Sequence, residues 1–314
     1  MTPAESNLTE FPCPVCGAVD YQELYPDKLG NGLPKFGYDF SPRHSDHYRV
    51  VRCAHCQHAY CSPRPANLYR SYLDVQDAEY LRNEAQRVAT YEKTIDTIRR
   101  FKPQGKLLDV GCASGDFLAV ARRNYGVEGL ELSRWAAALA RERGYAVHAC
   151  RLSELLQSTL YDVVTMWGVI EHFEFPRHEL AEIRRLLTPH GLVCLWTGDI
   201  DSLPSRLLGS KWWYVQGQHI QFFSLRSLDG LFASAGFFVL VMLGTLLAGR
   251  RVDQPAIAWA EALDEPEGGA RPGVWDRLGL WFVVAVVLVL IAYAIPLWDL
   301  LHLPRYGSPG FKPF

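Results

Sequence analysis

Short apolar segments alternate with amphipathic segments of helical periodicity along residues 105–248, and this alternation constrains the fold more than any other feature of the chain. The strands that it predicts are 106–110, 127–132, 145–148, 162–167, 192–197 and 237–243. The helices that it predicts between them are 117–124, 134–143, 177–187 and 225–235. A strand–helix–strand order at this spacing is typical of right-handed crossovers, so we predict an α/β fold with a doubly wound, mostly parallel sheet.

The segments on either side of this region have a different character. Residues 1–65 are rich in cysteine, proline, glycine and histidine and predict a small separate module. Residues 66–101 place apolar side chains at steps of three and four, which predicts one helix that leads into the α/β domain at 66–248. Residues 249–277 are polar and contain several prolines and glycines, so we interpret them as a linker.

A glycine turn follows the first predicted strand, in the sequence LLDVGCASGDFL at 107–118. Gly111 and Gly115 allow the backbone to adopt positive φ and to approach a ligand closely, and the start of the next helix supplies unpaired N–H groups. The Gly-x-x-x-Gly spacing differs from the Gly-x-Gly-x-x-Gly of dinucleotide-binding turns. Asp109 lies two residues before the first glycine, where a carboxylate would repel a pyrophosphate but would favour a cationic ligand.

An acidic residue, Glu131, ends the second predicted strand, and a carboxylate there can accept hydrogen bonds from both hydroxyls of a ribose. Together with the glycine turn and Asp109, it suits a nucleoside that carries a cationic amino-acid tail. S-adenosylmethionine (SAM) has this chemistry. The alternative, an oxidoreductase that uses a nicotinamide cofactor, is disfavoured by the glycine spacing.

The glycine turn and the acid resemble the first two motifs of the class I SAM-dependent methyltransferases. Later segments resemble further motifs of that family in the same order: YDVVTMWGVIEHF at 161–173, LLTPHGLV at 186–193, and HIQFFSLRSL at 219–228 with AGF at 235–237. The resemblance extends over about 66–245. Within the family, the sequence is similar to subgroups that modify ubiquinone precursors, sugars and glycans. It implies a Rossmann-like sheet of seven strands, mostly parallel.

The resemblance also implies which residues bind SAM. Small residues of the turn would line the methionine end, Glu131 would hold the ribose, Leu132 would pack on the adenine, and the end of the fourth strand would flank the sulfonium. Ala113 departs from the family pattern, since many members have glycine there. The third strand lacks the acid that often binds the adenine amine, so the backbone of Leu152 is assigned this role. The implied cofactor-binding residues are Asp109, Gly111, Ala113, Ser114, Gly115, Glu131, Leu132, Leu152, Trp167 and Gly168.

Methyl transfer from a sulfonium is an in-line displacement, so alignment supplies much of the catalysis, and a hydroxyl acceptor also needs a base. Glu171 and His172 follow the fourth predicted strand directly, and His219 lies before the last predicted helix. We predict that His172 or His219 is the base; the alternative is that the acid–histidine pair only caps a helix or orders a loop. Ubiquinone-type O-methyltransferases use an acid three residues before such a pair to bind a metal. This chain has Gly168 there, so no catalytic metal is expected.

An aromatic cluster of Trp212, Trp213 and Tyr214 precedes His219. It could form a wall of the acceptor pocket or the core of a lid, and the sequence does not distinguish these roles.

Two Cys-x-x-Cys pairs lie in the N-terminal module, Cys13 with Cys16 and Cys53 with Cys56. Two such pairs can complete a tetrahedral, all-thiolate zinc site, so we predict a structural zinc ion in a zinc-ribbon-like module. The alternatives are a redox pair, or ligands from nearby histidines, namely His44, His47, His55 and His58. Some sugar-modifying methyltransferases carry a similar module, which by analogy points to a role in acceptor binding.

Residues 278–298 contain no charged side chain and have aromatic residues toward both ends, which predicts a single transmembrane helix followed by a short tail at 299–314. An interfacial helix is the alternative. Flanking charges do not settle the orientation, but SAM is cytosolic, so we place the catalytic domain on the cytoplasmic side.

These observations predict a membrane-anchored, SAM-dependent methyltransferase that methylates oxygen in a lipid-linked sugar, a glycan precursor or a quinone-like lipid. The alternative is an anchored protein that binds SAM without catalysis. A net charge of −2 gives no basic field for nucleic acid, so the expected partners are a small-molecule or lipid-linked acceptor and the membrane. The oligomeric state is not predicted.

Overall fold

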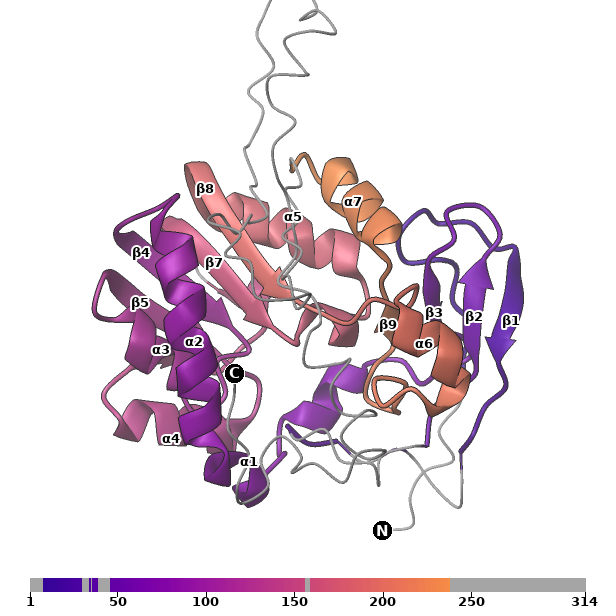
Figure 1. Ribbon diagram of the computed structural model, residues 1–314, viewed down its shortest axis with the longest axis horizontal. Helices are drawn as coiled ribbons and strands as arrows, with labels where there is room; N and C mark the ends of the chain where they lie inside the picture. The colour runs from indigo at the N-terminus through magenta and orange to yellow at the C-terminus, as the bar shows by residue number, and fades with distance from the viewer. Residues whose placement is uncertain (1–7, 30–33, 35, 39–45, 156–158, 238–314) are drawn as a thin grey trace, which may run out of the picture.

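The computed structural model describes residues 8–29, 34, 36–38, 46–155 and 159–237 (Figure 1). The predicted linker, the predicted transmembrane helix at 278–298 and the tail lie outside these residues. Within the part of the chain that is described, no helix combines the length and the hydropathy that a membrane crossing requires.

A parallel sheet of five strands forms the centre of the molecule, in the order β6-β5-β4-β7-β8. The strands are β4 (Gly105–Val110), β5 (Tyr125–Leu130), β6 (Ala146–His148), β7 (Tyr161–Trp167) and β8 (Leu187–Trp196). The order reverses between β4 and β7, and open α/β sheets bind ligands at the carboxyl ends of the strands beside such a reversal. The sheet has five strands in the described residues, against the seven that the resemblance implies. The sixth predicted strand, 237–243, lies outside these residues apart from Phe237, and the sequence assigned no segment to a seventh.

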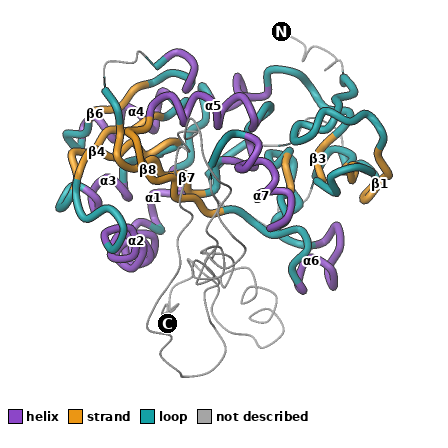
Figure 2. Tube along the Cα trace, turned by 90° about the horizontal axis from the view of Figure 1, so that it is seen from above, coloured by secondary structure: helices purple, strands orange, loops and turns teal. Residues whose placement is uncertain are grey.

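Helices cover both faces of this sheet (Figures 1 and 2). One face, which includes Leu107 and Val163, packs on α2 (Glu84–Arg99) and α3 (Asp116–Ala121). The opposite face, which includes Leu108 and Val164, packs on α5 (Pro176–Leu186) and α7 (Leu225–Ser234). Successive strand residues point to opposite faces, so each strand contributes to two cores. A further helix, α4 (Arg134–Glu142), packs its alanines against α3 and β6.

The prediction of one helix over 66–101 is wrong. The segment contains a 3₁₀ turn, Leu68–Tyr72, then α1 (Ala78–Arg82), and only then α2. The side chain of Asp77 accepts a hydrogen bond from the N–H of Tyr80 at 3.0 Å and so starts a new helix within the segment. The apolar face predicted for the later part of the segment is present, since Ile95 and Ile98 of α2 are buried.

A second, antiparallel sheet contains both the N-terminal module and a late segment of the chain, in the order β1-β2-β3-β9. Its strands are β1 (Tyr21–Tyr25), β2 (Val50–Cys53), β3 (Ala59–Cys61) and β9 (Gln221–Phe222). Ala59 pairs with Phe222 and Tyr60 with Gln221, so this sheet links the cysteine-rich module to the segment that follows His219.

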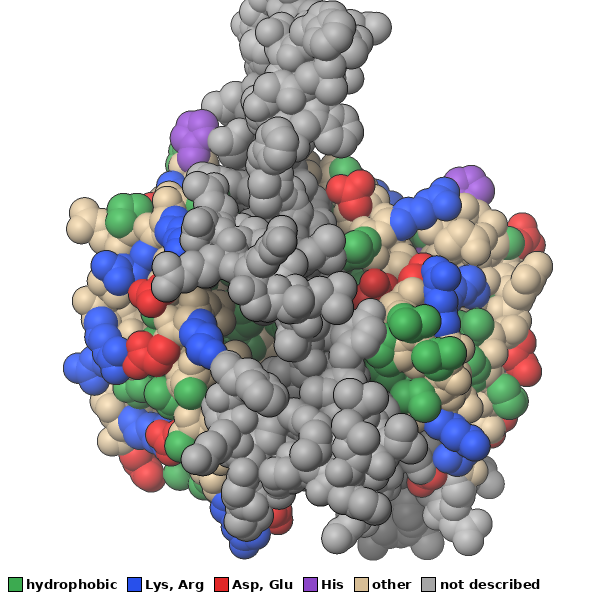
Figure 3. Space-filling model, viewed as in Figure 1, with side chains coloured by type: hydrophobic (Ala, Val, Ile, Leu, Met, Phe, Trp, Pro, Cys, Tyr) green, Lys and Arg blue, Asp and Glu red, His purple; other side chains and the backbone are tan. Residues whose placement is uncertain are grey.

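Charged side chains of both signs are mixed over the described surface seen in Figure 3 rather than separated into patches. A short helix after β8, α6 (Leu203–Leu208), exposes Leu203 and Leu207 more than most other large apolar side chains of the described residues.

Candidate functional site

The turn between β4 and α3 holds three residues in the left-handed region of backbone conformation. The φ angles are 73° at Gly111, 46° at Ala113 and 86° at Gly115. A Cβ atom at Gly111 would lie 2.6 Å from Cγ2 of Val169, so only glycine fits there without a shift. Ala113 adopts the left-handed conformation at a cost of about 1 kcal/mol. The alanine therefore keeps the backbone shape that a glycine would take freely.

Glu131 lies directly after β5, and its carboxylate joins three parts of the chain. It accepts hydrogen bonds from the N–H of Ala113 at 2.9 Å, the N–H of Ser133 at 2.8 Å and the hydroxyl of Tyr38 at 2.9 Å. Burial raises the pKa of Glu131 above its usual value, although these hydrogen bonds oppose the shift. The acid predicted to bind a ribose is thus in contact with the glycine turn.

Asp109 is buried at the end of β4, where its carboxyl accepts a hydrogen bond from the hydroxyl of Thr165 at 2.7 Å. Burial raises the pKa of Asp109 to about 8, and the neighbouring carboxylates of Glu131 and Asp116 add to the shift. At neutral pH Asp109 therefore keeps its proton and carries no charge at the turn.

The raised pKa of Asp109 predicts a pH dependence of stability. The folded protein keeps this proton up to about pH 8, whereas the unfolded chain releases it near 3.8. Between these values the folded state binds more protons, so the free energy of unfolding falls as pH rises. We expect the Tm of the ligand-free protein to fall by at least about 3 °C between pH 5 and pH 8, and Asp109→Asn to flatten this decline. An equal slope in both proteins would contradict the assignment.

The other predicted cofactor-binding residues lie around this turn with different exposure. Ser114 is buried and donates to Asp116 at 3.0 Å, while Leu132 keeps part of its surface exposed next to Glu131. Leu152 is buried in a 3₁₀ turn, Leu152–Glu154. Gly168 has a φ of 69° and donates its N–H to the carbonyl of Trp196 at 3.0 Å. Trp167 packs on the ring of Phe117 at 5.0 Å, on the face of the sheet that α2 and α3 cover.

The structure brings Glu171, His172 and His219 together, with ligand atoms within 4.8 Å of one another. Glu171 is fully buried and accepts hydrogen bonds from the hydroxyls of Thr197, at 3.1 Å, and Tyr214. Burial raises the pKa of Glu171 to about 7. The spacing of the three side chains would also suit a metal ion, but both carboxylate oxygens of Glu171 already have protein partners.

His172 has a defined tautomer. Its Nδ1 lies 2.8 Å from the carbonyl oxygen of Gln218 and 2.7 Å from the hydroxyl of Tyr72. A carbonyl oxygen only accepts hydrogen bonds, so Nδ1 carries the proton and Nε2 carries the lone pair. Burial lowers the pKa of His172 to about 4, so its imidazole is neutral at physiological pH. The side chain is partly exposed.

His219 shares the Nδ1–H tautomer of His172 but differs in its burial and in the partner of Nε2. Its side chain is completely buried, Nδ1 lies 2.7 Å from the carbonyl of Tyr214, and Nε2 lies 3.2 Å from the amide nitrogen of Gln216. Burial lowers the pKa of His219 well below its usual value. Since partners within the chain engage both ring nitrogens, the geometry favours a structural role for His219 beside His172.

The four cysteines of the two pairs converge. Sγ of Cys13 lies 3.5 Å from Sγ of Cys56, and Sγ of Cys16 lies 3.6 Å from Sγ of Cys53. A tetrahedral zinc ion with bonds of about 2.3 Å separates its sulfur ligands by about 3.8 Å, so the donor set fits zinc. Burial raises the pKa of Cys56 to about 11 and also raises that of Cys13. Hydrogen bonds from the N–H groups of Cys56 and His55 and from neighbouring thiols lower the pKa of Cys53 against the effect of burial.

The aromatic cluster that precedes His219 is mostly core. Trp212 and Tyr214 are buried among residues of β2, β3 and β9, and Trp213 is partly buried against them. Tyr214 also contacts the site through its hydrogen bond to Glu171.

Two tyrosines of the site, Tyr38 and Tyr72, were not predicted. Tyr38 reaches Glu131 from the segment between the two cysteine pairs, and Tyr72 reaches His172 from a 3₁₀ turn. Neither lies in a recognisable motif. Their contacts join segments about 100 residues apart, and a single sequence carries no signal for such pairs.

A family model described as a methyltransferase domain matches residues 78–240, just over half of the chain. An uncharacterized protein of Methanocaldococcus jannaschii is 25% identical over 146 residues, which cover 46% of this chain and 68% of that protein. Geranyl diphosphate 2-C-methyltransferase of Saccharopolyspora erythraea is 32% identical over 142 residues, which cover 40% of this chain and 50% of that enzyme. The chain therefore matches only half the length of the second relative.

Among solved structures, a SAM-dependent methyltransferase of Thermotoga maritima, described as a possible histamine N-methyltransferase, is 23% identical and has a TM-score of 0.45. The similarity covers 59% of this chain and 97% of that one.

Proposed function

Because this chain belongs to the class I SAM-dependent methyltransferases, with its methyltransferase domain at residues 78–240, we propose that it methylates a hydroxyl group of a membrane-associated acceptor. The proposed acceptors are a lipid-linked sugar, a glycan precursor or a quinone-like lipid. The observation that carries the choice of oxygen is the neutral imidazole of His172, whose Nε2 has a lone pair available as a base.

The residues around the glycine turn fit SAM. Gly111 and Gly115 keep the turn compact, because a Cβ atom at either position would clash with Val169 or Tyr145. Oε2 of Glu131, which accepts from the N–H of Ala113, can take a second hydrogen bond from a ribose hydroxyl. SAM, when bound, supplies a methyl group on a positively charged sulfur, and the sulfur keeps the electron pair of the C–S bond when the methyl group is transferred.

His172 is the proposed base. As the acceptor oxygen forms its bond to the methyl carbon, the hydroxyl proton moves to Nε2 of His172, and the imidazolium that results keeps its Nδ1–H bond to Gln218. Backbone groups of Gln218 and Gly168 raise the pKa of His172 against the effect of burial, so they favour the protonated form. Glu171, held by Thr197 and Tyr214, adds negative charge nearby when it is ionised.

Transfer of label tests the proposed reaction. SAM labelled in its methyl group is incubated with the full-length protein and with extracts of membrane lipids and glycans, and the products are separated. We expect label in a lipid-extractable acceptor as a methyl ether. Label only on nitrogen or carbon would contradict O-methylation, and no label above that of a boiled-enzyme blank would contradict transfer to these acceptors.

The predicted role of Glu131 can be tested by its amide variant. Glu131→Gln replaces one carboxylate oxygen by an NH₂ group, which cannot accept a hydrogen bond, and removes the charge that strengthens a hydrogen bond to a ribose hydroxyl. We therefore expect SAM affinity to fall by about 10-fold or more. Calorimetry with SAM measures the change. Glu128→Gln is the matched control, since Glu128 lies on β5 but pairs with His148 and Tyr161 instead. Equal affinity of the Glu131 variant and the wild type would contradict the role.

We also propose that Cys13, Cys16, Cys53 and Cys56 hold a structural zinc ion. The converging sulfur atoms and the backbone N–H groups directed at Cys53 support this, because a structural zinc site has four protein ligands and stabilises thiolates.

Membrane attachment through residues 278–298 is a further part of the proposal, and an uncharged run of this length supports it. A chain truncated after Gly273 is expected to remain in the supernatant when membranes are sedimented after an alkaline wash, and the full chain is expected to sediment. Equal distribution of the two chains would contradict the anchor.

A further inference from the structure

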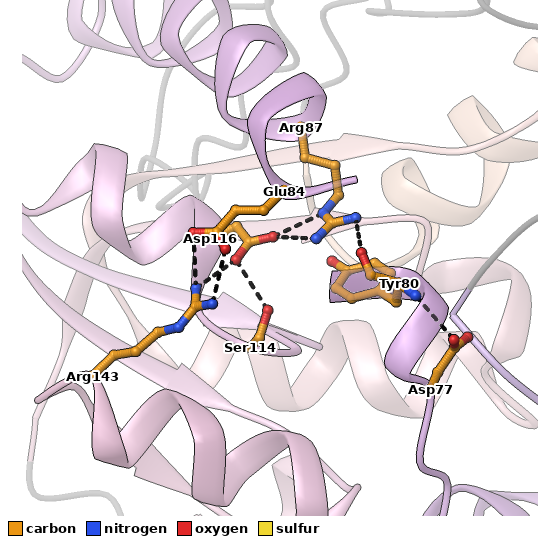
Figure 4. Close-up of polar contacts among 7 residues, drawn as sticks. All are labelled: Asp77, Tyr80, Glu84, Arg87, Ser114, Asp116 and Arg143. Atoms are coloured by element: carbon orange, nitrogen blue, oxygen red, sulfur yellow. Dashed lines mark hydrogen bonds and ion pairs between the residues drawn. The ribbon is translucent and has the colours of Figure 1, made fainter. Parts of the chain in front are cut away.

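A series of polar contacts runs from the glycine turn through α1 to Glu131, and Figure 4 shows most of it. It begins at Ser114, whose hydroxyl donates to Oδ1 of Asp116 at 3.0 Å. Oδ2 of Asp116 then accepts two hydrogen bonds from Arg87, from Nε at 2.8 Å and from Nη2 at 2.6 Å. The first residue of α3 is thus held by a side chain of α2.

Arg87 makes a second, separate connection to α1. Its Nη1 donates to the carbonyl oxygen of Tyr80 at 2.6 Å, and its guanidinium carbon lies 3.5 Å from the centroid of the Tyr80 ring. A guanidinium this close to an aromatic face is attracted by the π system, so one side chain fixes both the backbone and the ring of Tyr80.

The start of α1 is connected to the other end of the site. Asp77 accepts the N–H of Tyr80 on one oxygen and the N–H of Tyr38, at 2.9 Å, on the other. The ring of Tyr38 lies 5.2 Å from that of Tyr80, and its hydroxyl donates to Glu131. Residues 77–82, which we call the strap, therefore connect the acid of α3 to the acid that follows β5.

The strap also contributes a side chain to the charged centre of the site. Burial raises the pKa of Tyr80, Arg87 opposes that shift, and the carboxylates of Asp116, Asp109 and Glu131 add to it. These are the three acids around the glycine turn, so the Tyr80 hydroxyl lies within their electrostatic reach.

Asp116 has a second arginine partner that does not touch the strap. The side chain of Asp116 is 2% exposed. The second arginine is Arg143, whose Nη1 donates to Oδ1 of Asp116 at 2.8 Å. The rest of the Arg143 guanidinium pairs with Glu84 at 3.0 Å. Arg87 and Arg143 thus both neutralise one buried carboxylate, but only Arg87 joins it to Tyr80. Substitutions of the two arginines can therefore distinguish the effect of losing a positive charge beside Asp116 from the effect of losing the connection to Tyr80.

We propose that Arg87 is a positioning residue for the methyl donor: it holds the strap against the glycine turn, so that Tyr80 and Tyr38 keep their places beside bound SAM. This inference rests on the proposed function, in which the donor lies at that turn. Loss of Arg87 weakens donor binding because part of the binding free energy must then order the strap.

The test compares Arg87→Gln with Arg143→Gln in the full-length protein, by calorimetric titration with SAM and by Tm. Both variants remove one guanidinium from Asp116. We expect SAM affinity to fall by at least about 30-fold in Arg87→Gln and by no more than about threefold in Arg143→Gln. With labelled SAM, the KM for SAM rises in Arg87→Gln, while kcat at saturating SAM stays within about twofold. Arg87→Lys restores only part of the affinity, since an ammonium lacks the planar fork that reaches Asp116 and Tyr80 together.

Two further variants keep the inference testable if Arg87→Gln fails to fold. Tyr80→Ala leaves the partners of Asp116 in place and is expected to reproduce the loss of SAM affinity, whereas Tyr80→Phe keeps the ring over Arg87 and should retain most of it. Equal losses in the Arg87 and Arg143 variants, or wild-type affinity in Arg87→Gln or Tyr80→Ala, would overturn the positioning role. Failure of the wild-type protein to bind SAM would overturn the proposed function itself, so the two failures are distinct.

Discussion

Replacing His172 by alanine is expected to slow methyl transfer by a factor of about 10² to 10⁴, while the affinity for SAM stays within about threefold of the wild-type value. The reason is the fixed tautomer: with its proton on Nδ1, directed at Gln218, His172 presents the lone pair of Nε2 as the acceptor of the hydroxyl proton. Alanine removes the proton acceptor and leaves the glycine turn and Glu131 unchanged. The measurement is label transferred from SAM to the acceptor fraction that the wild-type enzyme methylates, with SAM affinity measured separately.

His178→Ala is the control for this variant, because His178 is an exposed histidine of α5 and no role is assigned to it. The pH profile adds an independent check. A base with a pKa of about 4 is already deprotonated across pH 5 to 8, so wild-type kcat/KM should show no acid limb near pH 6.5 from this group. Transfer by His172→Ala within about threefold of the wild-type rate would contradict its role as base.

Removal of one zinc ligand is the second change with a large expected effect. Cys53→Ser should abolish stoichiometric zinc and lower the Tm by more than about 10 °C, since structural zinc contributes several kcal/mol to the fold and 1 kcal/mol corresponds to about 2–4 °C in a chain of this size. Cys53 ends β2, at the centre of the antiparallel sheet, so the loss should spread to β3 and β9. Elemental analysis and thermal melting of the full-length protein measure both effects.

Cys53→Ser should also lower the rate of methyl transfer, because β9 and the residue before it are hydrogen-bonded to the segment at 171–173, which contains His172. The N–H of Ile220 donates to the carbonyl of Glu171 at 3.0 Å, and the amide of Gln221 donates to the carbonyl of Phe173 at 2.9 Å. Cys150→Ser is the control, since Cys150 lies outside the four-cysteine cluster. A wild-type protein without zinc, or equal zinc content in Cys53→Ser and the wild type, would contradict the metal site.

The sequence predicted the central sheet well because its strands are short, buried and apolar on both faces. Five of the six predicted strands are β4 to β8, although β8 begins at Leu187 rather than at 192. Its first part includes an irregularity in the pairing with β7, where His190 has a positive φ. The helix predicted over 66–101 failed for a local reason, the cap formed by Asp77. Periodicity reports which face of a helix is buried, but it does not report where a side-chain hydrogen bond interrupts the helix.

Site residues that lie in one short sequence motif were predicted, and those that reach the site from a distant segment of the chain were missed. The glycine turn lies within a short run of sequence, and its Ala113 departure is visible in the structure as a left-handed alanine. Tyr38 reaches Glu131, and Arg87 joins the strap to Asp116, only through tertiary packing. The two candidate bases, His172 and His219, looked equivalent in sequence, and only their hydrogen-bond partners distinguish them.

Calorimetric titration of the full-length wild-type protein with SAM, and in parallel with NADH, tests the central claim most directly, because every proposed role depends on a cationic sulfur nucleoside at the turn after β4. We expect SAM to bind with one site per chain and a Kd below about 100 μM, and NADH to give no measurable heat at the same concentration. No binding of SAM, or tighter binding of NADH than of SAM, would contradict the account.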